Sequence, residues 1–355
     1  MIKYLGSKRA LVGVLGALAE GAGARTAVDL FTGSTRVAQE FKRRGLLVTA
    51  ADLASYSEVL AQCYIATDAG AVDLAELDEW LARLNALPGV RGYVTETFCE
   101  RARFFQPHNG RRIDAIREHL TGLAGHRLYP VLLTALIEAA DRVDSTTGQH
   151  MAYLKSWAPR ASNQLWLRRP ALLAGTGIAL RGDAGALIGR LPPTDLMYLD
   201  PPYNQHRYFA CYHIWETLVR WDAPEHYGVA CKRADAREHA NPFNSRRGMP
   251  AALAAVIASA RAEVLVVSYN NEAWVGAETM IDWLRTAGHE RVETLAFDHR
   301  RYVGARIGIH NPAGERVGSV SHTRNTEYVF VAGPSDRVES ALAAVAEPVP
   351  AGSPA

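Results

Sequence analysis

The sequence has no paired cysteines and no long apolar run. Its four cysteines stand alone, without a C-x-x-C pair, which excludes a zinc finger or ribbon and makes a disulfide scaffold unexpected. No apolar run reaches the roughly 18 residues that a membrane-spanning helix needs, so we expect no contact with a membrane. Three histidines of the C-terminal third lack the spacing of metal ligands, so no metal site is predicted. They are His299, His310 and His322.

An excess of charge of one sign is also lacking, since the net charge of +2 by itself favours no partner. The basic residues before the apolar run 10–19 loosely imitate a signal peptide. Lys3 and Lys8 also belong to the motif Lys3-Tyr4-Leu5-Gly6-Ser7-Lys8, which explains them better than a signal peptide does, so we expect a cytoplasmic protein. With 355 residues and 48% hydrophobic side chains, the chain can bury a sizeable core.

Residues 25–52 have the pattern of a strand, a glycine-containing turn, a helix and a second strand. The apolar run 26–31 ends at Thr32-Gly33, and apolar residues then follow with helical spacing. A second apolar run, 46–51, ends at Asp52. This βαβ beginning predicts an α/β fold with an open parallel sheet.

A different pattern fills the next hundred residues. Helical spacing occurs there with few strand candidates. Residues 91–170 carry twelve Lys and Arg against seven Asp and Glu, which favours a surface for an acidic partner. The predicted helices cover residues 73–87, 111–123 and 131–140.

Strand patterns then resume, and a hairpin is predicted over 301–322. The expected strands include residues 177–180, 196–199, 264–268 and 328–331. We therefore predict one discontinuous domain with a helical insertion and a partly disordered tail that carries a short helical pattern. The predicted parts are 1–67 with 175–333 for the domain, 68–174 for the insertion and 334–355 for the tail.

The most informative motif is Asp200-Pro201-Pro202-Tyr203, directly after a buried-looking strand. Ligands of open α/β sheets bind at the carboxyl ends of strands. Two prolines stiffen the loop and remove two donors, so the Asp200 carboxylate and a proline carbonyl can accept hydrogen bonds from a planar amine. The Tyr203 ring can stack on the flat group that carries the amine. The alternative interpretation is a tight turn with a capping Asp and a core Tyr.

The first βα turn supplies matching residues. Asp29-Leu30-Phe31-Thr32-Gly33 lets the backbone approach a ligand closely, and Asp52 ends the next strand where an acid can bind ribose hydroxyls. An ordinary βα turn and an exposed Asp are the alternative.

These motifs occur in the order found in the Dam-type (alpha-class) DNA adenine-N6 methyltransferases, which the sequence resembles over about residues 1–67 and 175–332. The resemblance implies a Rossmann-like S-adenosylmethionine-dependent methyltransferase fold with a mostly helical insertion. It also implies that the enzyme methylates the amine of a flipped-out adenine, with Asp200, Pro201, Pro202 and Tyr203 as the catalytic residues. By the same resemblance, the cofactor-binding residues are Tyr4, Lys8, Asp29, Phe31, Gly33, Asp52, Asp183 and Asp200.

One position departs from the family pattern. Thr35 stands where the family usually has a second glycine, and a side chain there is expected to crowd the methionine end of the cofactor. Three alternatives remain: an RNA adenine methyltransferase, a nucleic-acid-binding protein impaired at Thr35, and a protein-glutamine methyltransferase, which would carry Asn in place of Asp200.

Double-stranded DNA is the expected partner, with a cognate restriction endonuclease as a further one and a monomer as the expected state. Basic residues among aromatics and Asn suit contacts to phosphates and base edges. A solvated surface is the alternative for each. The candidates are Lys155, Arg160, Arg168 and Arg169 in the insertion, Arg246 and Arg247 in a later loop, and Arg301 and Tyr302 in the hairpin. Ser268-Tyr269-Asn270-Asn271 is a further candidate for the target-base pocket.

Overall fold

The computed structural model describes residues 2–6, 8–202, 208–237, 241–300, 309–310, 316–318 and 324–346. The chain divides into two compact units, each built from three separate segments. The helical unit comprises residues 1–7, 54–174 and 206–240. The sheet unit comprises residues 8–53, 175–205 and 241–355.

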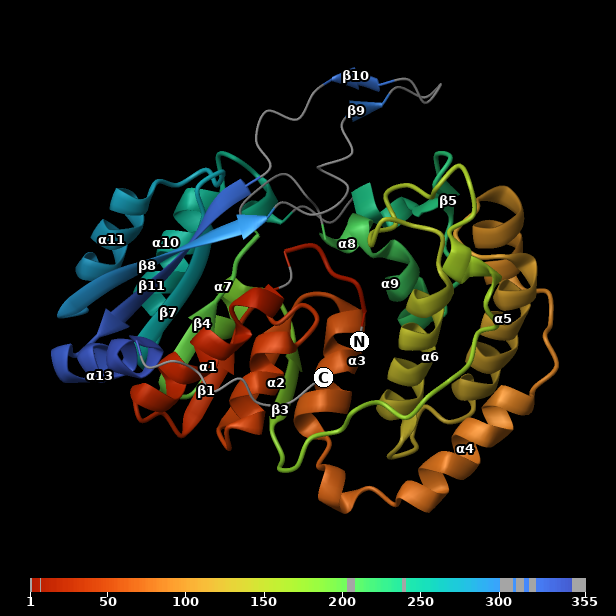
Figure 1. Cartoon of the computed structure of the whole chain (residues 1–355), viewed down its shortest axis with the longest axis horizontal. Helices are drawn as coiled ribbons and strands as arrows, with labels where there is room; N and C mark the ends of the chain where they lie inside the picture. Colours follow the sequence, from red (N-terminus) through yellow and green to blue (C-terminus); the bar gives the residue numbers. More distant parts are fainter. Residues whose placement is uncertain are drawn as a thin grey trace. The chain divides into compact units, whose positions relative to one another are not determined.

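The sheet unit is built on a seven-stranded sheet with the order β3-β2-β1-β4-β7-β11-β8 (Figure 1). Neighbouring strands are parallel except β11, which runs antiparallel to both β7 and β8. β9 and β10 form a separate antiparallel pair within the predicted hairpin region. The strands are β1 (Thr26–Asp29), β2 (Leu47–Asp52), β3 (Ile178–Arg181), β4 (Thr194–Leu199), β7 (Ala262–Asn270), β8 (Arg291–Arg300), β9 (Ile309–His310), β10 (Arg316–Gly318) and β11 (Arg324–Gly333).

Helices cover both faces of this sheet, because alternate residues of each strand point to opposite faces. Met197 and Leu199 of β4 join a core with α7, α10 and α11. Between them, Tyr198 lies edge-on to Phe41 of α2 on the other face, where α1 packs against α2 and α13. The helices are η1 (Lys8–Ala10), α1 (Val12–Gly21), α2 (Arg36–Arg43), α7 (Ala184–Ile188), η7 (Pro242–Asn244), α10 (Met249–Ser259), α11 (Ala277–Thr286) and α13 (Ser335–Ala346).

The strand order reverses between β1 and β4. From β1 the chain builds outward to β2 and β3, then returns to place β4 on the other side of β1. At such a switch point the connections leave in opposite directions, which opens a crevice at the carboxyl ends of the two strands. The acids Asp29 and Asp200 stand at these two ends.

Among its described residues, the helical unit has no strand of the main sheet and contains only the short antiparallel pair β5–β6. Proline at the first turn of α5 and of α6, and the Asp73 carboxylate at the start of α4, are typical helix N-terminal signals. Its elements are α3 (Ser55–Ala61), η2 (Gln62–Ala66), η3 (Ala69–Ala71), α4 (Leu74–Ala86), η4 (Thr95–Arg101), α5 (Pro107–Thr121), α6 (Tyr129–Val143), η5 (Pro159–Ser162), α8 (Tyr208–Cys211), α9 (His213–Arg220), β5 (His226–Tyr227), β6 (Lys232–Arg233) and η6 (Ala234–Arg237).

The unit boundaries differ from those expected from the sequence. The helical unit begins at residue 54 instead of 68, and it includes residues 206–240, which the sequence assigned to the catalytic part. The reason is packing: α3 packs against α9, and Ser55 donates hydrogen bonds to the buried Glu216 carboxylate. The predicted helical pattern in the tail is α13. Residues 347–355 lie outside the described part.

None of the helices in the described part of the chain is both long enough and apolar enough to cross a membrane.

Candidate active site

Three acids end neighbouring strands at the carboxyl edge of the sheet unit. Asp29 is the last residue of β1, Asp52 the last of β2, and Asp200 follows β4. One Asp52 oxygen accepts a hydrogen bond from the Gly33 N–H at 2.9 Å and holds the first βα turn. Gly33 has φ +50°, a left-handed conformation that glycine adopts without strain. The sequence-predicted turn and its two acids are therefore brought together.

Asp29 is buried and incompletely bonded. Its residue is 1% exposed, and one carboxylate oxygen accepts a hydrogen bond from the Thr32 hydroxyl at 3.0 Å. The other oxygen has no hydrogen-bond partner among the residues that the structure describes. Burial, followed by the charges of Asp200 and Asp52, raises the pKa of Asp29 to about 7, against the opposing effect of the Thr32 hydrogen bond. A carboxylate in this position fits a cationic ligand.

Asp200 is held by a buried lysine. The Lys8 ammonium lies 2.9 Å from the Asp200 carboxylate and 2.7 Å from the carboxylate of Glu327 on β11. Burial raises the pKa of Asp200 to about 6; Lys8 lowers it and Glu327 raises it. Glu327 faces Asn270, the last residue of β7, because β11 is antiparallel and begins at the carboxyl edge. Sequence reasoning missed Glu327; the available signal was one acid directly before the apolar run 328–331.

The remaining residues of the tetrapeptide follow Asp200 directly. Pro201 is buried and Pro202 is half-buried. Tyr203 lies outside the described residues. The Tyr198 hydroxyl in β4 donates to Ser268 at the end region of β7 at 2.8 Å, so the strand before Asp200 is bound to its neighbour by side chains as well as by backbone.

Two further predicted cofactor residues belong to the sheet unit. The Phe31 ring lies edge-on to the buried Phe243 ring, with centroids 5.1 Å apart. The Asp183 carboxylate accepts a hydrogen bond from the Ala186 N–H at 3.2 Å and caps α7. Phe31 is thus packed beside the first βα turn, and Asp183 lies between β3 and α7.

Tyr4 is placed in the helical unit. Its ring stacks on Tyr212 with centroids 4.6 Å apart, and its hydroxyl lies 3.3 Å from that of Tyr56. The neighbouring Lys3 ammonium forms ion pairs with the buried Asp141 and Asp144 carboxylates of the same unit. These contacts fasten the N-terminal segment.

Thr35 has a structural explanation. It adopts φ 62°, a left-handed conformation, and is fully buried at the start of α2. A β-branched residue is strained there, which explains why glycine suits this position. The Thr35 hydroxyl donates to the Ser34 carbonyl at 2.7 Å and accepts from the Gln39 amide at 2.8 Å. Both bonds are local to the turn and to α2.

Two of the basic candidates form ion pairs with carboxylates. Arg160 donates two hydrogen bonds to one oxygen of the buried Asp144, and Arg169 pairs with Asp78. Both guanidinium groups are therefore already engaged by carboxylates. Arg301 and Tyr302 lie outside the described residues. The exposed candidates are Lys155, Arg168, Arg169, Arg246 and Arg247.

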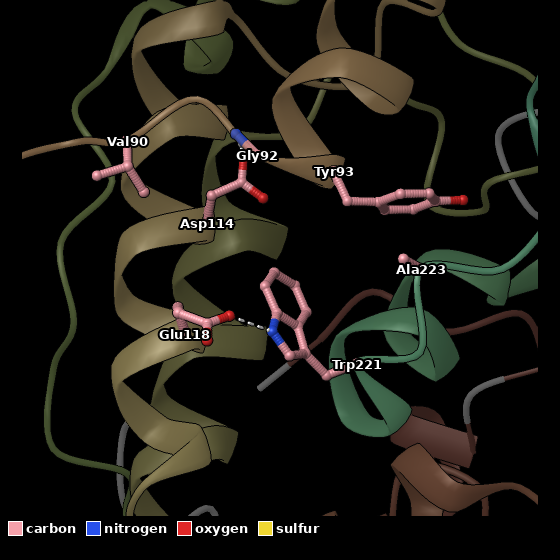
Figure 2. Close-up of a pocket in the computed structure, with 7 residues that line it drawn as sticks. All are labelled: Val90, Gly92, Tyr93, Asp114, Glu118, Trp221 and Ala223. Carbon is pink, nitrogen blue, oxygen red and sulfur yellow. Dashed lines mark hydrogen bonds between the residues drawn. The ribbon is translucent and has the colours of Figure 1, made fainter.

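A cavity of about 240 Å³ lies in the helical unit (Figure 2). Glu118 accepts a hydrogen bond from the Trp221 indole N–H at 2.8 Å across this cavity. Asp114 accepts from the backbone N–H groups of Gly92, Val94 and Thr95. Its acids thus hold local structure, whereas the acids of the sheet edge converge on the switch point. Within the described residues, no cluster of His, Cys, Asp and Glu is suited to hold a metal ion.

The sheet order, with acids at the ends of β1, β2 and β4, defines a Rossmann-like α/β fold with its switch point between β1 and β4. The profile of the D12 class N6 adenine-specific DNA methyltransferases matches residues 4–269, and the chain belongs to this family. The predicted family, fold class and cofactor are thereby confirmed: the chain is an S-adenosylmethionine-dependent, adenine-specific DNA methyltransferase.

Individual relatives agree. The type II methyltransferase M.NlaIII of Neisseria lactamica is 32% identical over 69% of this chain and 74% of its own length. The modification methylase StsI of Streptococcus sanguinis is 25% identical over 86% of this chain, which spans only half of that relative. The type II methyltransferase M.CviAII of Paramecium bursaria Chlorella virus 1 is 25% identical over 81% of this chain and 87% of its own length.

Proposed function

We propose that the chain methylates the N6 amine of an adenine flipped out of double-stranded DNA, at a specific site, with Asp200, Pro201, Pro202 and Tyr203 as the catalytic residues. The observation that carries this proposal is the position of Asp200 after β4 at the switch point, in contact with Lys8. An amine inside a duplex is inaccessible, and flipping its base costs a few kcal/mol.

The cofactor is proposed to bind along the first βα turn. S-adenosylmethionine supplies an electrophilic methyl group on a sulfonium. The unpartnered Asp29 oxygen suits a cationic group, and Gly33 permits close approach of the backbone. Asp52, at the end of β2, is proposed to accept hydrogen bonds from the ribose hydroxyls. Phe31 and Asp183 are proposed to complete the site, and Tyr4 and Lys8 to support it from the N-terminal segment.

Asp200 and the Pro201 carbonyl are proposed to accept the two hydrogen bonds of the adenine amine. Both are acceptors only, so they favour the amine orientation in which the nitrogen lone pair points away from them. The ionised Asp200 carboxylate also holds the proton that the nitrogen releases as its new bond to carbon forms. Tyr203 stacks on the base. The gain comes from positioning and preorganised charge.

DNA recognition is proposed to involve the helical insertion, residues 68–174, with the catalytic part in 1–67 and 175–333. Among the predicted contacts, Lys155, Arg168, Arg246 and Arg247 are exposed, which supports a role at phosphates. Arg160 and Arg169 would have to leave their carboxylate partners first.

Further proposals concern the cell. A cognate restriction endonuclease is proposed as a companion, since relatives are named type II methyltransferases and modification methylases. We also propose that the chain works as a monomer in the cytoplasm.

The test is incorporation of labelled methyl from S-adenosylmethionine into unmethylated DNA, with the product nucleosides resolved and structured RNA as a competitor. Asp200→Ala should reduce incorporation at least about 1000-fold while cofactor affinity changes little. Full activity of that variant would overturn the mechanism, and label in RNA would transfer the activity to RNA.

Asp52→Ala provides a second test. It should weaken cofactor binding, measured by calorimetry, about tenfold or more, while DNA binding is retained, because the acid serves the cofactor side of the site. An equal loss of both affinities would contradict the ribose role.

A further inference from the structure

Glu327 is a buried carboxylate at the edge where Asp200 stands. Its side chain is 6% exposed. A carboxylate this deeply buried is costly unless a cation compensates it, and the compensating cation here is Lys8 at 2.7 Å. Lys8 is itself 6% exposed and lies 2.9 Å from Asp200, so one buried ammonium contacts two carboxylates.

This three-residue contact joins distant parts of the chain within the sheet unit. Lys8 belongs to η1, Asp200 follows β4, and Glu327 belongs to β11. β11 is bound on both sides, by β7 and by β8, so the Glu327 backbone has little freedom. The most firmly held member of the group is therefore the one with no proposed contact to a ligand.

We propose that Glu327 is a positioning residue that acts through Lys8, holding the ammonium in place and sharing its charge so that the Asp200 carboxylate keeps its strength as an acceptor. The inference rests on the proposed role of Asp200. If Lys8 paired with Asp200 alone, its full charge would stabilise the carboxylate and weaken its hydrogen bond to the adenine amine.

Three charged groups act on Asp200 among the described residues, and a fourth acts on one of them. Lys8 lowers its pKa and Glu327 raises it. Asp29 at the end of β1 is coupled to Asp200, and Asp52 at the end of β2 is coupled to Asp29. Tyr198, on β4, stays neutral because burial raises its pKa. Removal of the Glu327 charge should therefore lower the pKa of Asp200.

The experiment is the single-turnover rate of methyl transfer between pH 5 and 9 with saturating cofactor and DNA. In Glu327→Gln, which keeps an oxygen that can accept from Lys8, the acid limb should move about one unit to lower pH, and the plateau rate should fall roughly tenfold. The control is Glu263→Gln, which also removes one carboxylate charge but lies at the end of β7 away from Asn270. It should change neither the position of the acid limb nor the plateau rate. An unmoved limb in Glu327→Gln overturns the proposal.

Two further measurements separate the possible failures. Carbon-13 NMR of labelled aspartate carboxyls in cofactor-free protein, with Asp200→Asn assigning the signal, should show the same downward shift of the pKa in Glu327→Gln. In a Lys8→Met background, Glu327→Gln should change the plateau rate less than twofold, since no ammonium is left for Glu327 to hold in place. If the two substitutions instead lower the rate by independent factors that multiply in the double variant, the proposed action of Glu327 through Lys8 is overturned. An active Asp200→Asn enzyme instead overturns the catalytic role that the proposed function gives to the Asp200 carboxylate.

Discussion

At the scale of single residues, the site combines groups that are costly for stability with groups that bind. Asp29 is buried with an unpartnered oxygen, and Thr35 is held in a left-handed conformation. Strained or uncompensated groups persist only where the surrounding structure holds them in place, and they concentrate at functional sites. The left-handed backbone conformation of position 35 explains why glycine is typical of the family there. The Thr35 side chain forms its hydrogen bonds within its own turn and with α2.

Asp29→Asn should stabilise the cofactor-free protein above pH 7. The folded-state pKa of Asp29, about 7, lies above the unfolded value near 3.8. The folded state therefore binds the extra proton in the window from about 4 to 7, and stability is lost as the pH rises through that window. Thermal unfolding at pH 8 should show a gain on the order of 1–2 kcal/mol, with loss of stabilisation by S-adenosylmethionine.

The exposed Asp282 on α11 provides the control, since Asp282→Asn should change neither the melting temperature nor the response to cofactor. If Asp29→Asn is instead less stable than the unmodified protein at pH 8, then the folded structure stabilises the Asp29 carboxylate, and the prediction is contradicted.

At the scale of elements, asparagine side chains accept the backbone hydrogen bonds that a neighbouring strand would accept in a sheet. The segment 163–169 belongs to no helix or strand, and its buried Leu165 and Leu167 alternate with exposed residues. Asn109 accepts from the Leu165 N–H at 2.8 Å, and Asn85 accepts from the Leu167 N–H at 2.9 Å. Buried backbone groups must be bonded, and here two helix asparagines bond them.

Asn109→Ala should destabilise the protein by about 2–3 kcal/mol, because it leaves the Leu165 N–H and the Asn163 carbonyl without their partner. Denaturant unfolding measures the change. Asn163→Ala, at an exposed position of the same segment, should cost less than about 0.5 kcal/mol. Equal costs for the two variants would contradict this explanation.

At the scale of the whole molecule, the net charge of +2 does not show which basic side chains can contact DNA phosphates and which form ion pairs with carboxylates of the protein. Arg169 is paired with Asp78, whereas Arg246 and Arg247 are exposed. Phosphate contacts release counterions, so the salt dependence of DNA binding counts the cations that take part.

Arg246→Ala and Arg247→Ala should each weaken binding to every duplex and reduce the slope of log K against log salt by about 0.9. Arg169→Ala should leave the slope unchanged, since its guanidinium is already neutralised. Fluorescence anisotropy over a salt series makes the comparison. An unchanged slope in both loop variants would exclude this loop from the DNA interface.

Local signals in the sequence were sufficient for much of this fold. The βαβ beginning, the strand before Asp200 and the helices of 73–140 all follow from periodicity, and the structure has each of them. β8 was missed because its residues 291–300 alternate apolar and polar side chains only weakly. Residues 206–240 were assigned to the catalytic part because their place in the chain says nothing of their packing against α3 and α6.

The sequence by itself determined the chemistry available to this protein: an acid and two prolines after a strand, and acids after two others, in the order of a known family. Which groups act on one another was decided only by the tertiary structure. Glu327 contacts Lys8, which also contacts Asp200, because an antiparallel strand brings position 327 to the same edge as positions 8 and 200. Sequence separation carries no information on such a contact, whereas burial makes its electrostatic effect large.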